Sequence, residues 1–478
     1  MMKLSRLLDG ISDITVGCFS DAEITSVSVN SKSTSRASLF VAIVGARSDG
    51  HDYVSEAYSR GTRVFVVSRK VDLPNDTVIV FSKNTRKTLA ELCAKISGNP
   101  ERRLVFVGVT GTKGKTTTAY LLSKILDYHG VKNILISTLG ISGEVRRKTE
   151  NTTPDPTVLF HAFARASHKG VKVVILEVSS QAVKNLRIYG INFDYLAFTG
   201  LSSDHVGEFE HPTKSDYIMS KRGLFTSYGA KFAVVNYDNS YSAYISAGVA
   251  KVIKCGFSVG ADYRISDFTD SKLGAVYSVS GVAVRSSLPG KYNAVNTVIA
   301  LALAREITGC KIRDCALILD TVSVPGRFEV YDVNGCNVIV DYAHNYESVK
   351  EVLALARSLY GGKIICVFGS VGGRSFERRG ELARAGEKYA DFSVITSDNC
   401  YYESPISVCS EIYSYFVDKT KAKIITERKE AIKYALSLSA AGDTVMILGR
   451  GHENTINING EAIPFSDSEF VKTLGVVK

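Results

Sequence analysis

Residues 105–118 read Val-Phe-Val-Gly-Val-Thr-Gly-Thr-Lys-Gly-Lys-Thr-Thr-Thr, and this stretch decides how the rest of the chain is interpreted. A short apolar run predicts a buried strand, a glycine-rich loop follows it, and residues 117–128 have the pattern of a helix. Gly111 and Gly114 let the loop turn so that its amide N–H groups point at phosphate oxygens, and the start of the helix adds the positive end of its dipole. The stretch therefore predicts an ATP-binding loop.

The polar residues of this loop are of the types that phosphate chemistry needs. Lys115 is placed to reach the β- and γ-phosphates of ATP, and the Thr116 hydroxyl is placed to hold Mg²⁺. We expect ATP contacts along the whole loop, from Gly111, Thr112, Lys113, Gly114, Lys115, Thr116 and Thr117. The strict spacing G-x-x-x-x-G-K is not met, because Val109 stands five residues before Gly114, and this departure points away from generic P-loop NTPases.

Strand-like and helix-like segments alternate along the whole chain. Short apolar runs predict strands at 105–109, 171–176, 195–198, 232–236, 338–340, 364–367 and 445–448. Helical patterns lie between them at 117–128, 294–307, 347–359 and 406–417. This alternation is typical of α/β layers built on parallel sheets. Seams at 97–100 and 323–326 divide the chain into residues 1–100, 101–324 and 325–478.

Composition excludes several classes of protein. The chain has 478 residues, of which 45% are hydrophobic and 22% charged, as in ordinary globular proteins. Its net charge of 58 − 48 = +10 is scattered, so nucleic acid is not indicated and small polyanions are equally compatible. No run approaches the roughly 18 apolar residues of a membrane span, and residues 1–10 lack a signal-peptide core. Nine cysteines without a C-x-x-C pair favour reduced thiols, so we expect a soluble, cytoplasmic, multidomain protein.

An acidic residue and several histidines stand at positions suited to chemistry. Glu177 ends the strand-like run 171–176 and opens Val-Ser-Ser180, so it is placed to hold Mg²⁺ or to orient water near the phosphate loop. Asp204-His205 follows the run 195–198 in the same way, although both acids could instead be helix caps. Five histidines lie in polar or glycine-rich stretches, which favours functional roles: His51, His205, His211, His344 and His452.

Six motifs that occur in order carry a resemblance to a known family. They span residues 110–117, 150–154, 177–180, 201–205, 341–344 and 449–453. In this order they resemble the Mur ligases, specifically the UDP-N-acetylmuramoyl-tripeptide synthetase branch. The resemblance covers essentially the whole chain, including Asn30-Ser-Lys32 and Asp49-Gly-His51. It implies three α/β domains: an N-terminal uridine-nucleotide-binding domain, a central ATP-binding domain with a P-loop parallel sheet, and a Rossmann-like C-terminal domain that binds an amino acid.

The resemblance also implies a reaction. An ATP-dependent ligase adds a free amino acid to UDP-N-acetylmuramoyl-L-alanyl-D-glutamate during peptidoglycan precursor synthesis, and so serves cell-wall biogenesis, cell shape, the cell cycle and cell division. The substrate carboxylate becomes an acyl phosphate, the amino group attacks, and a tetrahedral intermediate collapses to an amide with release of phosphate. Such chemistry needs neutralised negative charge and a positioned amine rather than a protein nucleophile. The implied cofactors are ATP and Mg²⁺, and we expect a monomer without nucleic-acid partners or membrane insertion.

The resemblance assigns the catalytic roles to Lys115, Glu177, His205 and Lys221. Lys115 stabilises the transferred phosphate, Thr116 and Glu177 bind a first Mg²⁺, and His205 is a ligand of a second. Lys221 matches the lysine that this family carbamylates, and as N6-carboxylysine it would complete the second metal site. The alternative for Lys221 is an ordinary exposed helical lysine.

The resemblance also implies which residues bind adenine, the uridine nucleotide and the amino acid. Adenine contacts fall on Asn293 and Asn296, and the C-terminal domain adds Arg327, Asp341 and His344 to the ATP site when the domains close. The uridine diphosphate end of the substrate faces Ser31, Asp49 and His51. The muramoyl-dipeptide end is held by Thr152, Thr153, Ser180 and Arg187. The incoming amino acid is bound by Arg374, Asp398, Asn399, Gly449 and Glu453.

Three departures from the family pattern bear on function. The usual Glu-Val-Ser-Ser-His ends in Gln181, and the segment after His205 is altered and slightly longer. Members that add meso-diaminopimelate usually have Asp-Asn-Pro-Arg, where this chain has Asp398-Asn-Cys-Tyr401. No guanidinium stands there to pair with the distal carboxylate, while Glu453 still matches the acid that holds the distal ammonium. These residues weakly favour L-lysine or another diamino acid, with a neutral or smaller amino acid left open.

The sequence leaves two alternative functions open. A non-catalytic paralogue that binds the uridine nucleotide is motivated by Gln181 and by the altered segment after His205. A folylpolyglutamate-synthetase-like ligase would share the central and C-terminal domains. The N-terminal 100 residues argue against the second alternative, because that branch begins close to its phosphate loop.

Overall fold

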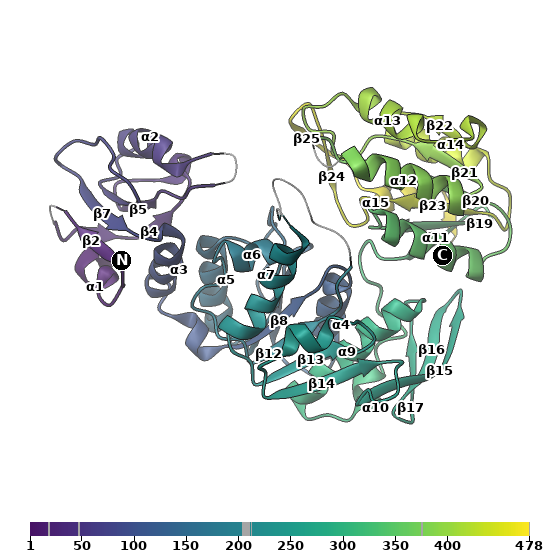
Figure 1. The fold of residues 1–478 in the computed structure, drawn as a ribbon, viewed down its shortest axis with the longest axis horizontal. Helices are drawn as coiled ribbons and strands as arrows, with labels where there is room; N and C mark the ends of the chain where they lie inside the picture. The colour runs from purple at the N-terminus through teal and green to yellow at the C-terminus, as the bar shows by residue number, and fades with distance from the viewer. Residues whose placement is uncertain (18–19, 46–47, 203–210, 212, 374–375, 478) are drawn as a thin grey trace. The chain divides into compact units, whose positions relative to one another are not determined.

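The computed structural model describes residues 1–17, 20–45, 48–202, 211, 213–373 and 376–477. These residues form two compact units, one of residues 1–265 and 295–315, the other of residues 266–294 and 316–478. Both units combine helices with largely parallel sheets, which confirms the predicted α/β class (Figure 1). Each unit is described by itself.

The N-terminal part of the first unit contains a five-stranded sheet. Its strand order is β2 (Ile14–Val16), β7 (Val78–Ser82), β6 (Val64–Val67), β5 (Ser38–Val41) and β4 (Ser26–Ser28). Helix α3 (Thr85–Ile96) begins after Asn84, whose side chain accepts a hydrogen bond from the Lys87 amide. The apolar face of α3 packs with residues of α5 (Pro156–His168) in one continuous core. The small sheet is thereby anchored to the part of the unit that carries the phosphate loop.

The central sheet of the first unit places the phosphate loop at a change in strand order. Seven of its strands run β10 (Gly140–Gly143), β9 (Asn133–Ser137), β11 (Val173–Glu177), β8 (Val105–Thr110), β12 (Tyr195–Phe198), β13 (Phe232–Asn236) and β14 (Lys251–Gly256). All of these except β10 are parallel to their neighbours. The chain runs from β8 outward to β9, back to β11, and then across to β12. Such a switch point leaves a crevice at the carboxyl ends of the strands, where α/β proteins bind ligands.

The second unit contains a mixed sheet that is covered on both faces. Its order is β22 (Ala422–Ile424), β21 (Phe392–Ile395), β20 (Ile364–Phe368), β23 (Thr444–Leu448), β19 (Cys336–Asp341), β18 (Glu329–Val333) and β26 (Val476–Val477). The sheet is parallel from β22 to β19 and antiparallel at β18 and β26. Along β20, Ile364, Cys366 and Phe368 join one core cluster, whereas Ile365 and Val367 join the other. Burial on both faces explains why these runs are continuously apolar rather than alternating, and it confirms the Rossmann-like expectation.

Helices α11 (Tyr346–Leu359), α12 (Phe376–Tyr389) and α13 (Pro405–Ser414) contribute to the first of these clusters, and α14 (Arg428–Ser437) and α15 (Asp467–Lys472) to the second. The predicted helix 406–417 ends early, at Ser414. The amides of Tyr415 and Phe416 bond the carbonyls three residues back, so the last turn tightens and the helix stops.

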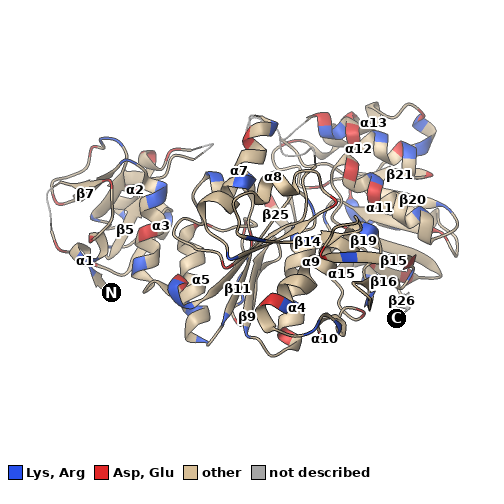
Figure 2. Ribbon diagram, turned by 60° about the horizontal axis from the view of Figure 1, so that its bottom comes forward, with Lys and Arg blue, Asp and Glu red and all other residues tan. Residues whose placement is uncertain are grey.

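Several helices carry both basic and acidic residues. Figure 2 shows basic and acidic residues close together on helices such as α12, whose sequence Phe-Glu-Arg-Arg-Gly-Glu mixes both. Among the described helices, none combines the length and the apolar character needed to cross a membrane.

Candidate active site

The phosphate loop lies between the end of β8 and the start of α4 (Lys115–Tyr128). Gly111 has φ +152° and Gly114 has φ +82°, conformations that other residues rarely adopt. A Cβ atom at Gly111 would lie 2.0 Å from Thr199 Oγ1, and one at Gly114 would lie 2.3 Å from Asn296 Oδ1. Both glycines are therefore required by close packing as well as by backbone conformation. The contact at Gly114 also shows that Asn296, a predicted adenine contact, lies against the loop.

Two lysines place positive charge on the same backbone oxygen of the loop. Lys115 Nζ donates to Gly111 O at 2.9 Å and to Thr112 O at 3.0 Å. Lys221, on α7 (Lys214–Ser227), donates to Gly111 O at 2.9 Å and is only 2% exposed. Lys221 is thus a buried residue of the loop's surroundings rather than an exposed helical lysine.

Tyr217 fixes α7 against the loop. Its hydroxyl lies 2.9 Å from Thr112 Oγ1, and the Lys221 ammonium lies 4.8 Å from its ring centre. The Thr112 hydroxyl also accepts the Ser202 amide at 3.1 Å. Sequence reasoning noted only that Tyr217 keeps its offset from Lys221, and the contact with Thr112 could not be found from that spacing.

A buried carboxylate meets the loop from the neighbouring strand. Glu177 is fully buried at the end of β11, and the Thr116 hydroxyl donates to its Oε2 at 3.1 Å. Thr138 adds its amide to Oε1 at 3.3 Å and its hydroxyl to Oε2 at 3.4 Å. We name Lys115, Thr116, Glu177 and Lys221 the loop site. The sequence did not indicate Thr138, because this residue follows a different strand and meets Glu177 only when the sheet forms.

The donor set of the loop site fits Mg²⁺. A carboxylate, a hydroxyl and phosphate oxygens of a nucleotide are the hard oxygen ligands that this ion prefers, and it usually keeps several waters. Among the described residues, no three His, Cys, Asp or Glu side chains gather as a metal site by themselves. The predicted ligand His205 lies outside the described residues.

The residues predicted for the muramoyl-dipeptide end converge beside Glu177. The Thr153 hydroxyl donates to Glu177 O at 2.7 Å, and Arg187 Nη1 donates to Thr153 O at 2.9 Å. The Thr152 hydroxyl lies 3.2 Å from that of Thr138. A pocket of the first unit continues from Arg187 and is lined by Val29, Ile43, Arg86, Leu89, Asp155, Pro156, Asn185 and Arg187. It joins this end of the site to the N-terminal residues.

The residues predicted for the uridine end are held by local hydrogen bonds. His51 is buried, its Nδ1 lies 2.5 Å from Asp49 Oδ1, and its Nε2 accepts the Ser68 amide at 2.9 Å. The His51 amide holds the pKa of Asp49 at about 2. The Ser31 hydroxyl donates to Glu56 at 2.6 Å. Both ring nitrogens of His51 are occupied within the protein, which sequence spacing did not indicate.

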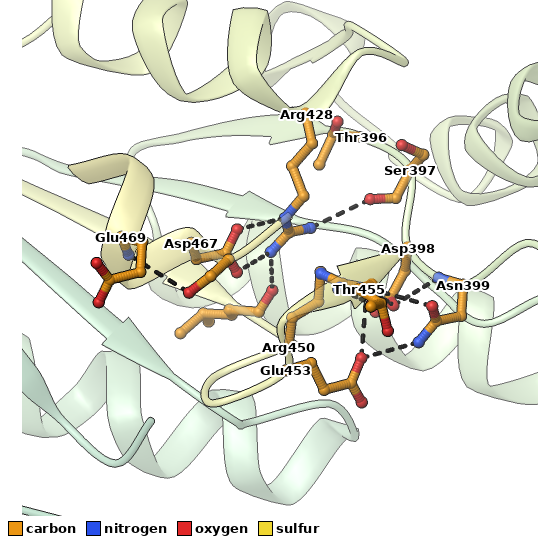
Figure 3. Close-up of polar contacts among 12 residues, drawn as sticks. Thr396, Ser397, Asp398, Asn399, Arg428, Arg450, Glu453, Thr455, Asp467 and Glu469 are labelled. Carbon is orange, nitrogen blue, oxygen red and sulfur yellow. Dashed lines mark hydrogen bonds and ion pairs between the residues drawn. The ribbon is translucent and has the colours of Figure 1, made fainter. Parts of the chain in front are cut away.

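The second unit gathers four of the predicted amino-acid-binding residues around a buried arginine (Figure 3). Arg450 Nη1 lies 3.2 Å from Asp398 Oδ1 and 3.3 Å from Glu453 Oε2, and the Asn399 amide donates to Glu453 at 2.9 Å. Gly449 has φ +105°, and a Cβ there would lie 3.1 Å from Asp398. Burial raises the pKa of Glu453. We name Asp398, Asn399, Arg450 and Glu453 the charge cluster; predicted Arg374 lies outside the described residues.

Buried Arg428 supports this arrangement from behind. It pairs with Asp467 at 2.7 Å and donates to the carbonyls of Ser397 and Leu448, the residues just before Asp398 and Gly449 (Figure 3). Sequence reasoning missed both arginines. Arg450 stood inside the quoted motif 449–453, whereas Arg428 had no signal.

The other predicted ATP residues are held by backbone and aromatic contacts. Both oxygens of Asp341 accept backbone amides at 2.8 Å, from Phe328 and Ala343, while burial raises its pKa. The Arg327 guanidinium lies 4.5 Å from the Tyr342 ring centre, and the His344 ring packs on the same tyrosine. Asn293 donates to Pro289 O at 2.7 Å.

Comparisons with known proteins cover almost the whole chain. Residues 23–97 match the Mur ligase family catalytic domain, residues 109–304 the Mur ligase middle domain, and residues 326–451 the Mur ligase glutamate ligase domain. A UDP-N-acetylmuramoyl-L-alanyl-D-glutamate–2,6-diaminopimelate ligase of Aquifex aeolicus is 37% identical over 94% of this chain and 93% of its own length. The ligase of the same name from Bacillus cereus is 34% identical over 98% of both chains.

A solved structure agrees with these matches. The structure of a UDP-N-acetylmuramoyl-L-alanyl-D-glutamate–2,6-diaminopimelate ligase superposes with a TM-score of 0.66 at 25% identity, and the match covers 94% of each chain. The likeness therefore extends over most of the chain.

Proposed function

The chain belongs to the Mur ligase family of ATP-dependent amide ligases, and we propose that it joins a diamino acid to UDP-N-acetylmuramoyl-L-alanyl-D-glutamate. The observation that carries this proposal is the loop site, where two lysines, a hydroxyl and a buried carboxylate converge on one glycine-rich loop. The relatives named above act on the same acceptor nucleotide. We assign the uridine-nucleotide, ATP and amino-acid domains to residues 1–100, 101–324 and 325–478.

In the proposed reaction the substrate carboxylate attacks the γ-phosphorus of ATP, and ADP leaves. The ammonium of the incoming amino acid gives one proton to solvent, and the free amine attacks the acyl carbon. The tetrahedral intermediate gives a second proton to solvent and expels phosphate, which keeps one carboxylate oxygen. Lys115 compensates the charge that develops on the transferred phosphoryl group. Thr116 and Glu177 would hold Mg²⁺, which neutralises phosphate charge when bound.

We propose that Lys221 carries a carboxyl group on Nζ and, with His205, holds a second Mg²⁺. Its burial beside Gly111 supports this, because a carbamate is an anion that a metal and the loop's cations would stabilise. A Lys221→Ala variant is expected to lose turnover and to regain part of it with formate or acetate. Full turnover of that variant would remove this assignment.

We propose that the acceptor is L-lysine or a similar diamino acid, bound through Asp398, Asn399, Gly449, Glu453 and Arg374. Glu453 supplies a carboxylate for a distal ammonium, and Tyr401 stands where a guanidinium would pair with the distal carboxylate of meso-diaminopimelate. The enzyme would act as a cytoplasmic monomer that supplies cell-wall precursors for growth and division.

Phosphate release with ATP, Mg²⁺ and the uridine-nucleotide dipeptide tests the proposal. Each diamino acid and the other common amino acids are supplied separately. Turnover that requires the nucleotide and one diamino acid is expected. Tight binding of the nucleotide without turnover on any amino acid would favour the non-catalytic paralogue instead.

A further inference from the structure

Three described side chains form a hydrogen-bonded chain beside the loop site. Ser180 begins α6 (Ser180–Lys184), and its Oγ lies 2.8 Å from His211 Nε2. His211 Nδ1 lies 2.8 Å from Asp216 Oδ2, which also accepts Lys184 Nζ at 2.8 Å. His211 is fully buried and Ser180 is 7% exposed. These hydrogen bonds thus connect the surface ion pair of Lys184 and Asp216 with the buried hydroxyl of Ser180, three residues after Glu177.

The partners determine where each hydrogen lies. Bonds from Lys184 and His211 lower the pKa of Asp216, so the carboxylate is ionised and can only accept. Nδ1 of His211 therefore carries a hydrogen. Burial lowers the pKa of His211 and keeps the ring neutral, so Nε2 is an acceptor and the Ser180 hydroxyl donates to it. The single hydrogen of this hydroxyl is then committed, and only lone pairs remain for another partner.

His51 shows the same tautomer in a different setting. Its Nδ1 also bonds an aspartate, but its Nε2 accepts the backbone amide of Ser68 at 2.9 Å and lies 3.2 Å from the hydroxyl of the same residue. At His211 the corresponding nitrogen bonds the hydroxyl of Ser180 at 2.8 Å. Ser180 adjoins Ser179, whose amide bonds Thr153 in the predicted dipeptide end of the site. The hydroxyl is therefore held at the substrate side of the loop site.

We propose that Asp216 and His211 are positioning residues that fix the Ser180 hydroxyl as a hydrogen-bond acceptor for a substrate N–H group. This inference rests on the proposed function and deepens it. Two co-substrates carry such groups: the uridine-nucleotide dipeptide through its amides, and the incoming amino acid through its ammonium. The co-substrate whose KM responds to the variants below is the one that Ser180 binds.

The same residue types activate the nucleophile of serine hydrolases. Here the loop site offers phosphoryl transfer, for which no protein nucleophile is needed. Covalent labelling of Ser180 by a fluorophosphonate would overturn the positioning role.

A matched pair of variants separates positioning from packing. In His211→Gln the amide oxygen reaches the place of Nε2 and accepts from Ser180, whereas in His211→Asn the shorter amide reaches Asp216 only. His211→Asn is expected to raise the KM of one co-substrate roughly three- to tenfold, with kcat within about twofold, and His211→Gln to restore most of it. Ser180→Ala should raise the same KM, and the double variant Ser180→Ala/His211→Asn no further.

The control is His161→Asn, the same substitution at an exposed position of α5, which should leave every constant unchanged. Unchanged KM values in His211→Asn would overturn the proposal. So would equal rises for all three substrates together with a lowered unfolding temperature, because that pattern reports packing.

A second measurement does not depend on turnover. In protein labelled with ¹⁵N-histidine, the signal lost in His211→Asn identifies His211, and its nitrogen shifts report the tautomer. We expect hydrogen on Nδ1 only at neutral pH, and a shift of Nε2 in Ser180→Ala. Hydrogen on Nε2 overturns the proposal. A wild-type protein without turnover would refute the proposed function, while these spectra would still decide the Ser180 bond.

Discussion

The loop site and the charge cluster give their cations different kinds of partner. In the loop site, Lys115 and Lys221 both donate to the carbonyl of Gly111. In the charge cluster, Arg450 lies between the carboxylates of Asp398 and Glu453. The first region thus gathers its lysines on the loop that we propose binds ATP, whereas the second places its arginine between two carboxylates of the fold.

The largest effect is expected from removing the cation of the charge cluster. Arg450→Met would leave the buried carboxylate of Asp398 and the partly buried carboxylate of Glu453 without their shared partner, at a cost of about 3–5 kcal/mol in stability. The midpoint of urea unfolding, followed by circular dichroism, measures this. Arg450→Lys retains the charge and serves as the control. An unchanged midpoint in Arg450→Met would mean that the two regions do not differ as described.

The same substitution in the loop site is expected to act on chemistry instead. Lys115→Met should lower kcat for phosphate release by at least about a hundredfold, because a group that compensates charge in the transition state is lost. The urea midpoint should stay close to that of the wild type. A large loss of stability with only a small loss of kcat would reverse the assignment of the two regions.

Which parts of the two regions could be predicted depends on whether their residues are neighbours in sequence. The glycine loop was predicted because its residues are neighbours in sequence and their roles depend on local backbone geometry. Asp398 and Arg450 are 52 residues apart and meet only because β21 and β23 belong to one sheet. The motif 449–453 therefore indicated a site, but could not indicate that its arginine balances the acids. His211 and Ser180 are joined in the same long-range way.

A smaller effect, on amino-acid binding, is expected from removing the charge of Glu453 in the charge cluster. Glu453→Gln keeps the shape and the hydrogen bond from Asn399 but removes the charge offered to an ammonium. We expect the KM of the amino acid to rise roughly tenfold, with the KM values of ATP and the uridine nucleotide unchanged. Equal rises for all three would place Glu453 outside amino-acid binding.

The pH dependence of the KM of the amino acid also tests whether the charge of Glu453 binds it. Burial raises the pKa of Glu453, and only its ionised form attracts an ammonium. As the pH falls toward this raised pKa, the carboxylate takes up a proton and the KM should rise, by up to tenfold for each pH unit below it. In Glu453→Gln this acid limb should disappear. Persistence of the limb would assign it to another group.

The smallest effect concerns the choice of amino acid. Tyr401→Arg would supply a guanidinium where the Asp-Asn-Cys-Tyr segment lacks one. We expect the ratio of kcat/KM for meso-diaminopimelate over L-lysine to rise up to about tenfold. Comparison with Tyr401→Lys tests whether bidentate pairing is needed. A wild type that already prefers meso-diaminopimelate would show that another residue binds its distal carboxylate.

Transfer of ¹⁸O tests the central claim most directly. The uridine-nucleotide dipeptide is labelled with ¹⁸O in its reacting carboxylate, and the released phosphate is examined by mass spectrometry. An acyl-phosphate ligase leaves one labelled oxygen in each phosphate that accompanies amide formation. Phosphate without label, released whether or not an amino acid is present, would show simple ATP hydrolysis and contradict the account.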